Sequence, residues 1–310
     1  MNDNPFSSQP LSGIFVVAIA GLCIVFGANA VAIKVSLTGL GTFTAAGLRF
    51  SMAAAAVAVW AKFTGRPFKL RPHQLVPVLC LSLMFTVQLS LFYLGLSLTY
   101  ASRGALIVNL LPFFVLVLSH FFIPGDSITM KKLAGIALGF SGVAFLLLEN
   151  QATSAQLRSG DMIILGAAVL WAGNAVYTKR IIEGYHAFQL VFYPMLIAGP
   201  LILIEGWLLD PVMIGHLTSQ VVAALLYQGL ICAAFGFVAW SMLLKKFGAT
   251  TLHSFVFIMP VSAVVFSSLI LQEPVTRRLL LAALLICAGL LVIHLRTRRL
   301  TEAFPLGRHP

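Results

Sequence analysis

Two stretches of the sequence decide the fold: FGANAVAIK at residues 26–34 and WAGNAVYTK at residues 171–179. Both place an aromatic residue, an Asn-Ala-Val triplet and a lysine at the same relative positions. The correspondence continues along the chain, where Pro112 matches Pro260 and Asp126 matches Glu273 at nearly the same spacing. We therefore expect two similar halves, a first half at residues 13–148 and a second half at residues 161–295, with tails at 1–12 and 296–310.

The residues around these stretches are too apolar for a water-soluble protein. Of the 310 residues, 60% are hydrophobic and only 9% are charged, and the mean hydropathy is +0.99. A soluble domain normally has about 25% charged residues. A run of about 20 apolar residues can cross a bilayer as a helix, which satisfies its own backbone hydrogen bonds in lipid. Ten such runs are present, at residues 13–34, 42–60, 74–95, 102–122, 131–148, 161–181, 187–207, 219–243, 251–271 and 278–295.

Basic residues predict how these helices are oriented. With the N-terminus in the cytoplasm, most of the 20 Lys and Arg residues fall on the cytoplasmic side, as the positive-inside rule requires. Both termini are then cytoplasmic. Each half contains five helices, an odd number, so the second half crosses the membrane upside down relative to the first. The predicted fold is an all-α integral membrane protein of ten transmembrane helices, arranged as two inverted five-helix repeats.

With these features the sequence resembles the drug/metabolite transporter superfamily, in its ten-helix branch with paired EamA-type domains. The resemblance rests on the two quoted stretches, on Arg49, on Pro112 and Pro260, and on the Glu-Pro-Val-Thr run at residues 273–276. It covers essentially the whole chain between the tails.

The resemblance implies a secondary transporter in a bacterial cytoplasmic (inner) membrane, which exports amino acids or related metabolites by alternating access. Uptake or exchange by the same fold is the alternative. The expected partners are a small-molecule substrate and the lipid bilayer, with no cofactor, and the chain is expected to be a monomer or a weak homodimer. The halves differ at one important place, because Phe192 and Tyr193 occupy the region equivalent to Arg49. We therefore do not expect them to handle substrate symmetrically.

Other classes of function find little support in the sequence. The net charge of +11 does not indicate a nucleic-acid partner, because the basic residues lie in short connections and in the C-terminal tail. There is no Walker A phosphate loop, and the four cysteines show no metal-ligand spacing, so no metal site is predicted. No carboxylate lies near the middle of a predicted span, which disfavours a buried proton relay. An intramembrane enzyme or a channel remains the alternative from another class.

The few polar and aromatic residues inside the apolar runs are the candidates for a substrate site. Side-chain amides both donate and accept hydrogen bonds, and aromatic rings stack on organic solutes. Each candidate also has a structural interpretation, as a bridge between helices or as packing. The predicted substrate-binding residues are Phe26, Asn29, Arg49, Gln88, Asn109, Trp171, Asn174, Tyr177, Gln228 and His253, and Tyr93, Tyr227 and Trp240 extend the aromatic set.

Two prolines are candidates for hinges. Pro112 and Pro260 occupy matched positions in the fourth and ninth predicted helices. A proline in a helix interior removes a backbone hydrogen bond, and broken helices often surround the central site of a transporter. The structural alternative is that these prolines are merely tolerated within membrane helices.

Two basic residues lie within or near the predicted spans. Lys34 is expected to extend its ammonium group to the membrane interface. Arg49 lies about two turns inside the second predicted helix, where a charge is costly in lipid. It is expected either to cap backbone carbonyls at helix ends or to bind substrate directly. Direct binding predicts a substrate with an anionic group, as in a zwitterionic amino acid.

Overall fold

The computed structural model describes residues 13–125, 127–148, 154–247, 251–252 and 254–294. Within these ranges the regular secondary structure is helical, without β-strands, and an isolated β-bridge joins Leu40 to Ile214. The first half contains α1 (Gly13–Ser36), α2 (Thr42–Phe63), α3 (Pro72–Leu98), α4 (Ala101–Val108), α5 (Leu111–Phe122) and α6 (Met130–Leu147). The second half contains α7 (Ala155–Ile181), η1 (Ile182–Gly184), α8 (Ala187–Leu209), α9 (Ser219–Leu226), η2 (Tyr227–Gly236), α10 (Phe237–Phe247), α12 (Ile258–Leu271) and α13 (Arg277–His294).

Long apolar helices dominate the described part of the chain. Eight helical segments there have the length and composition needed to cross a membrane, and the shorter helix Ile258–Leu271 is also apolar. The prediction of an all-helical, multi-pass membrane protein is therefore confirmed. In the first half, each of the five predicted runs coincides with one of these segments to within a few residues.

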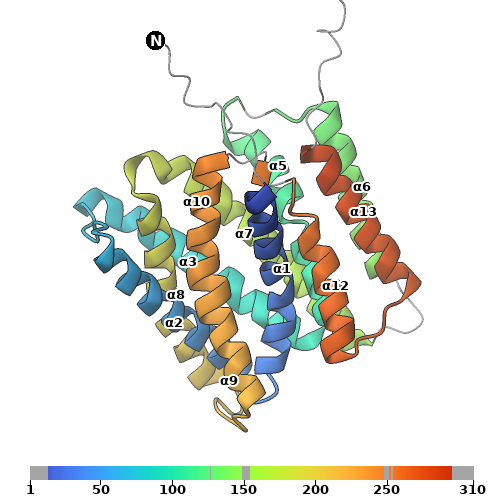
Figure 1. The fold of residues 1–310 in the computed structure, drawn as a ribbon, viewed down its shortest axis with the longest axis horizontal. Coiled ribbons are helices and arrows are strands. Elements are labelled where there is room, and N and C mark those ends of the chain that lie inside the picture. Colours follow the sequence, from blue (N-terminus) through green and yellow to red (C-terminus); the bar gives the residue numbers. More distant parts are fainter. Residues whose placement is uncertain (1–12, 126, 149–153, 248–250, 253, 295–310) are drawn as a thin grey trace, which may run out of the picture.

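Helices from the two halves pack against each other across the whole molecule. Helix α2 packs on α8, α3 on α7, α1 on α12, and α6 on α13. Figure 1 shows α6 and α13 side by side at one edge of the bundle, with α2 and α8 toward the other edge. Each pair combines one helix from each half, so the interface between the halves extends through the entire bundle.

Glycines bring the backbones of the two halves close together in these pairs, and two of the pairs have a glycine on each side of the contact. Between α3 and α7, a Cβ atom added to Gly160 would lie 2.7 Å from the carbonyl oxygen of Gly95. Between α6 and α13, a Cβ atom added to Gly289 would lie 2.7 Å from the carbonyl oxygen of Gly135. Small residues are the usual means of close packing between membrane helices, because lipid supplies no hydrophobic force that pushes helices together.

The two matched prolines follow breaks in their helices. Helix α4 ends at Val108 and α5 begins at Leu111, which places Pro112 in the first turn of α5. Helix α12 begins at Ile258, and Pro260 is its third residue. A proline is tolerated in a first turn because its missing N–H has no partner there in any helix. We predicted that both prolines lie in helix interiors, but each lies in a first turn, just after a break. Their role as hinges stays a prediction.

A π-helix forms the middle of the segment between Ser219 and Phe247. This element, η2, was not predicted, because its composition does not differ from that of the α-helices on either side. A π-helical turn widens the backbone and often occurs at functional positions. Gln228 is the second residue of η2 and is completely buried.

Candidate functional site

A chain of buried hydrogen bonds links four elements of the bundle. Arg49 of α2 donates from Nη1 to the hydroxyl of Tyr93 on α3, at 3.2 Å. That hydroxyl donates to Oε1 of Gln228 in η2, at 2.8 Å. Gln228 donates in turn from Nε2 to the carbonyl oxygen of Ala32 in α1, at 3.0 Å. The chain therefore joins three helices of the first half to the π-helix of the second.

Among the described residues, several other buried polar atoms of the first half have no hydrogen-bond partner. They are Nε of Arg49, both amide atoms of Gln88, Oδ1 of Asn29 and the hydroxyl of Ser51. Gln88 lies on the same helix as Tyr93 and is fully buried, and Asn29 lies one turn before Ala32 in α1. Buried polar groups are almost always satisfied in folded proteins, so a group of unsatisfied ones points to a bound solute or to water. We take these residues and Gln228 as the polar centre of the bundle.

The two aromatic candidates Phe26 and Trp171 lie in separate clusters of rings. Phe26 packs its ring against Phe237 and Trp240, with centroids 6.1 and 5.9 Å apart. Trp171 packs against Phe92, whose ring centroid lies 6.1 Å away. The described ring contacts thus connect α1 with α10 and α7 with α3, and they do not join Phe26 to Trp171.

Two more predicted residues make hydrogen bonds within or between helices, and a third packs against apolar side chains. Asn174 is buried and donates from Nδ2 to the carbonyl oxygen of Leu81, at 3.2 Å, which bridges α7 and α3. Asn109 sits in the break before α5 and donates to the carbonyl oxygen of Ala105, at 2.7 Å. Tyr177 is half-buried against an apolar cluster. Their roles in substrate binding stay predictions, and His253 lies outside the described residues.

A second polar cluster surrounds the turn between α3 and α4. Arg103 donates from Nε and Nη2 to Oδ2 of Asp161, at 3.0 and 2.6 Å, and from Nη2 to the carbonyl oxygen of Leu146. The hydroxyl of Thr99 donates to Oδ1 of the same carboxylate, at 2.7 Å. Asp161 is 0% exposed and Arg103 is 5% exposed, so this is a fully buried ion pair between the halves.

Further charged groups hold the same turn and a neighbouring helix end. Glu273 accepts from the backbone N–H groups of Ala101 and Ser102, at 2.6 and 2.9 Å, and so caps α4. Lys34 donates to the carbonyl oxygen of Leu96, at 3.1 Å, near the end of α3. Lys34 therefore caps the end of α3, and its position at the membrane interface stays a prediction.

Asp210 gives α2 a comparable cap. Its carboxylate accepts from the N–H of Phe43 and from the N–H and hydroxyl of Thr44. An anion at a helix N-terminus satisfies free N–H groups and is favoured by the helix dipole. Two carboxylates of the second half thus cap two helices of the first, and sequence reasoning missed both contacts.

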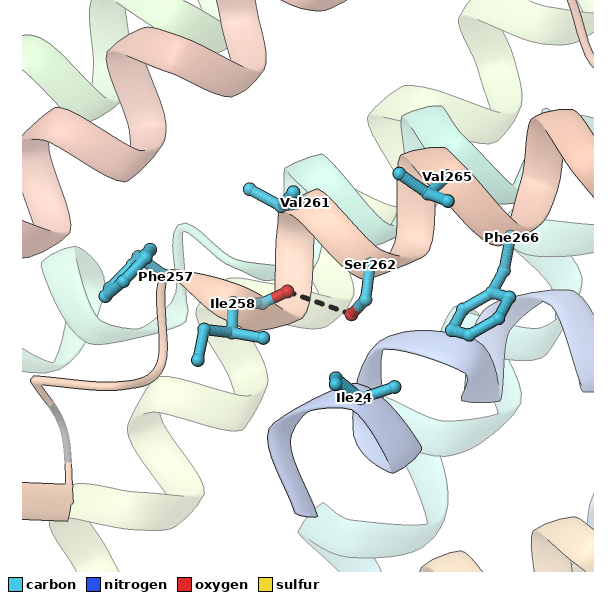
Figure 2. A pocket seen from close by; sticks show the side chains of 7 residues that line it. All are labelled: Ile24, Phe257, Ile258, Val261, Ser262, Val265 and Phe266. Carbon is cyan, nitrogen blue, oxygen red and sulfur yellow. Dashed lines mark hydrogen bonds between the residues drawn. The ribbon is translucent and has the colours of Figure 1, made fainter. Parts of the chain in front are cut away.

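Two pockets of the described structure are lined by other residues than those of the polar centre. One has a volume of about 330 Å³ and lies between Ile24 of α1 and a stripe of α12 that includes Val261 and Val265. Figure 2 shows the lining side chains together with Ser262, whose hydroxyl points toward Ile24 and donates to the carbonyl oxygen of Ile258. A second groove of about 410 Å³ lies between α2 and the η2–α10 segment. Both are lined mainly by apolar side chains, which suits contact with lipid acyl chains.

A bundle of long apolar helices with buried, unsatisfied polar atoms between its halves defines a polytopic membrane protein with a polar centre. The sequence model of the EamA-like transporter family matches this chain twice, over residues 11–148 and 158–295. The chain belongs to this family and is a multi-pass membrane transporter.

Related proteins agree with this assignment. A probable amino-acid metabolite efflux pump of Salmonella typhimurium is 28% identical over 87% of this chain and 91% of its own length. An uncharacterized transporter of Bacillus subtilis, YoaV, is 25% identical over 89% of this chain and 94% of its own. A solved crystal structure superposes on this chain with a TM-score of 0.67 at 18% identity. The superposition covers 91% of this chain and 97% of the other protein's chain. The last comparison shows the fold alone.

Proposed function

We propose that this chain is a secondary transporter of a bacterial cytoplasmic membrane that exports amino acids or related small polar metabolites by alternating access. The name of the Salmonella relative, a probable amino-acid metabolite efflux pump, supports the substrate class. The observation that carries the proposal is the polar centre, where unsatisfied donors and acceptors lie buried inside an apolar bundle. Such atoms are costly in lipid unless a polar solute or water uses them.

The proposed topology has ten spans, two inverted repeats and both termini in the cytoplasm. Contacts between connections support it, because they join connections that the topology places on one side. On the proposed outer side, Thr44 contacts Asp210 and Glu273 contacts Ala101. On the proposed cytoplasmic side, the amide of Gln74 donates to the carbonyl oxygen of Gly184. The pairing of α2 with α8 and of α6 with α13 also suits a two-fold relation between the halves.

Uptake or exchange is the second candidate for the direction of transport. A site between two halves is reached from each side in turn, so its residues act on a solute moving either way. The gradient of the solute or of a coupled ion then sets the net direction. A monomer or a weak homodimer fits this mechanism, because the proposed site lies within one chain.

A counterflow assay tests the proposal. The purified protein is placed in liposomes loaded with one unlabelled amino acid at high concentration, and entry of the labelled compound is followed over a panel of amino acids and other metabolites. We expect transient accumulation of at least one labelled amino acid above the level of empty liposomes. Accumulation of none of the panel would contradict the proposed substrate class.

A further inference from the structure

The bundle contains two buried arginines whose surroundings differ sharply. Arg103 is neutralised, because Asp161 accepts two of its hydrogen bonds and the carbonyl oxygen of Leu146 accepts another. Arg49 is equally buried, at 6% exposed, yet its one side-chain hydrogen bond goes to the neutral hydroxyl of Tyr93. Its Nε atom is buried without a partner.

No described carboxylate is available to neutralise Arg49. Asp161 binds Arg103, and Asp210 and Glu273 cap helices. Glu205 accepts from the hydroxyl of Ser90, and Glu183 is exposed in η1. These five are all the Asp and Glu residues that the described ranges contain. The guanidinium of Arg49 is therefore a buried cation without a counter-ion in this part of the chain.

The existing contacts of Arg49 compensate little of the cost of burying its charge. Its Cζ atom lies 4.8 Å from the centroid of the Phe50 ring, which is a cation–π contact. The hydroxyl of Tyr93 is a neutral acceptor and carries no balancing charge. A buried cation is normally balanced by an anion, because removing an ion from water is costly. A purely structural tie would also be expected to use more than one of the five N–H groups of Arg49.

We propose that Arg49 is an anion-binding subsite that receives the carboxylate of the transported solute. The proposal rests on the proposed function and adds the group that is recognised. A carboxylate accepts two parallel hydrogen bonds from a guanidinium, and Arg49 has an unused donor for such a pair. The hydrogen bonds that run from Arg49 through Tyr93 and Gln228 to Ala32 connect Arg49 with α1 and η2. The subsite therefore contacts both halves.

The remaining unsatisfied atoms complement the other end of an amino acid. The amide oxygens of Gln88 and Asn29 are buried acceptors without a donor, and an ammonium group supplies up to three donors. The solute we assign is therefore a monocarboxylate that also carries an ammonium or neutral polar group.

Binding of acid and amide pairs tests this subsite. The purified wild-type protein is titrated with alanine, leucine, phenylalanine, lysine and glutamate, and with the α-carboxamide of each, while its thermal unfolding is followed. Each pair differs only in the charged carboxylate. We expect at least one acid to bind tenfold or more tighter than its amide. In Arg49→Gln this preference should fall to about one, and in Arg49→Lys, which keeps the charge but loses the planar fork, it should be intermediate.

Two controls distinguish binding from folding. Without ligand, Arg49→Gln should keep the elution profile of the wild type, whereas Arg103→Gln should lose it because Asp161 is left unpaired. If Arg49→Gln does not fold, Arg49→Lys decides the question. An unchanged acid preference in that variant would overturn the proposal.

The other outcomes also decide the question. Equal binding of acid and amide by the wild type, or no binding of either, would overturn the proposal. Stabilisation by sodium chloride alone that depends on Arg49 would assign the site to an inorganic anion and overturn the assignment to substrate. If uncharged solutes show counterflow and acids are not preferred, the subsite is overturned and the transport function stands. If no solute shows counterflow, the transport function itself is rejected.

Discussion

Replacing Asp161 with Ala is expected to lower the free energy of unfolding by about 3–5 kcal/mol, as is typical when one partner of a buried ion pair is removed. The carboxylate is 0% exposed and receives hydrogen bonds from both Arg103 and Thr99. Its loss would leave the guanidinium buried without a counter-ion. It would also release α7 of the second half from the turn between α3 and α4 of the first.

Unfolding by a denaturing detergent in mixed micelles measures this effect, with Glu183→Ala as the matched control. Glu183 is an exposed acid in η1, and its removal should change stability by no more than roughly 0.5 kcal/mol. Removing both Arg103 and Asp161 should cost less than the sum of the two single changes, because no charge is then left unpaired. Additive effects would mean that the pair is not coupled.

Replacing Gly160 with Ala should weaken the same junction by about 1–3 kcal/mol, the usual cost of overpacking. The added Cβ atom would lie 2.7 Å from the carbonyl oxygen of Gly95 and 2.9 Å from the Cβ atom of Leu98. Backbone atoms of a membrane helix cannot move aside individually, so α3 and α7 would have to separate. The bonds around Asp161, the next residue, would lengthen with them.

The same helix contains the control for this change. Gly166 of α7 has no atom within 4 Å of its added Cβ position, and it is exposed on the surface of the bundle. Gly166→Ala should leave stability unchanged or raise it by up to about 1 kcal/mol, because Ala is the better helix former. The same mixed-micelle measurement compares the two variants, and equal effects would show that the Gly95–Gly160 contact does not limit stability.

Hydropathy predicted the helices of the first half to within a few residues, because the bilayer imposes a similar length and composition on every span. The runs at 42–60 and 102–122 correspond to Thr42–Phe63 and Ala101–Phe122. The repeat also located matched breaks near Pro112 and Pro260, although it did not show that each break precedes its proline. Arg49, Gln88 and Gln228 were found because a polar residue within an apolar run is rare and therefore informative.

The partners of the charged residues could not be predicted from the sequence. Asp161 was placed at a helix end, but α7 begins at Ala155, so the carboxylate lies inside the helix and faces Arg103. Contacts such as this join residues far apart in the chain, and no periodic pattern encodes them. The π-helix η2 packs against α1 and α2, and its local composition gives no signal for it. The buried atoms of the polar centre that have no hydrogen-bond partner became evident only from the three-dimensional structure.

The central claim is that one buried site between the halves opens to each side of the membrane in turn. Labelling of Gln88→Cys with a charged, membrane-impermeant thiol reagent tests it most directly, in right-side-out and in inside-out vesicles. Gln88 is 0% exposed in this structure, and the protein with only its four native cysteines gives the background. We expect labelling above background from both sides in separate experiments. Labelling from one side only, or from neither, would contradict the claim.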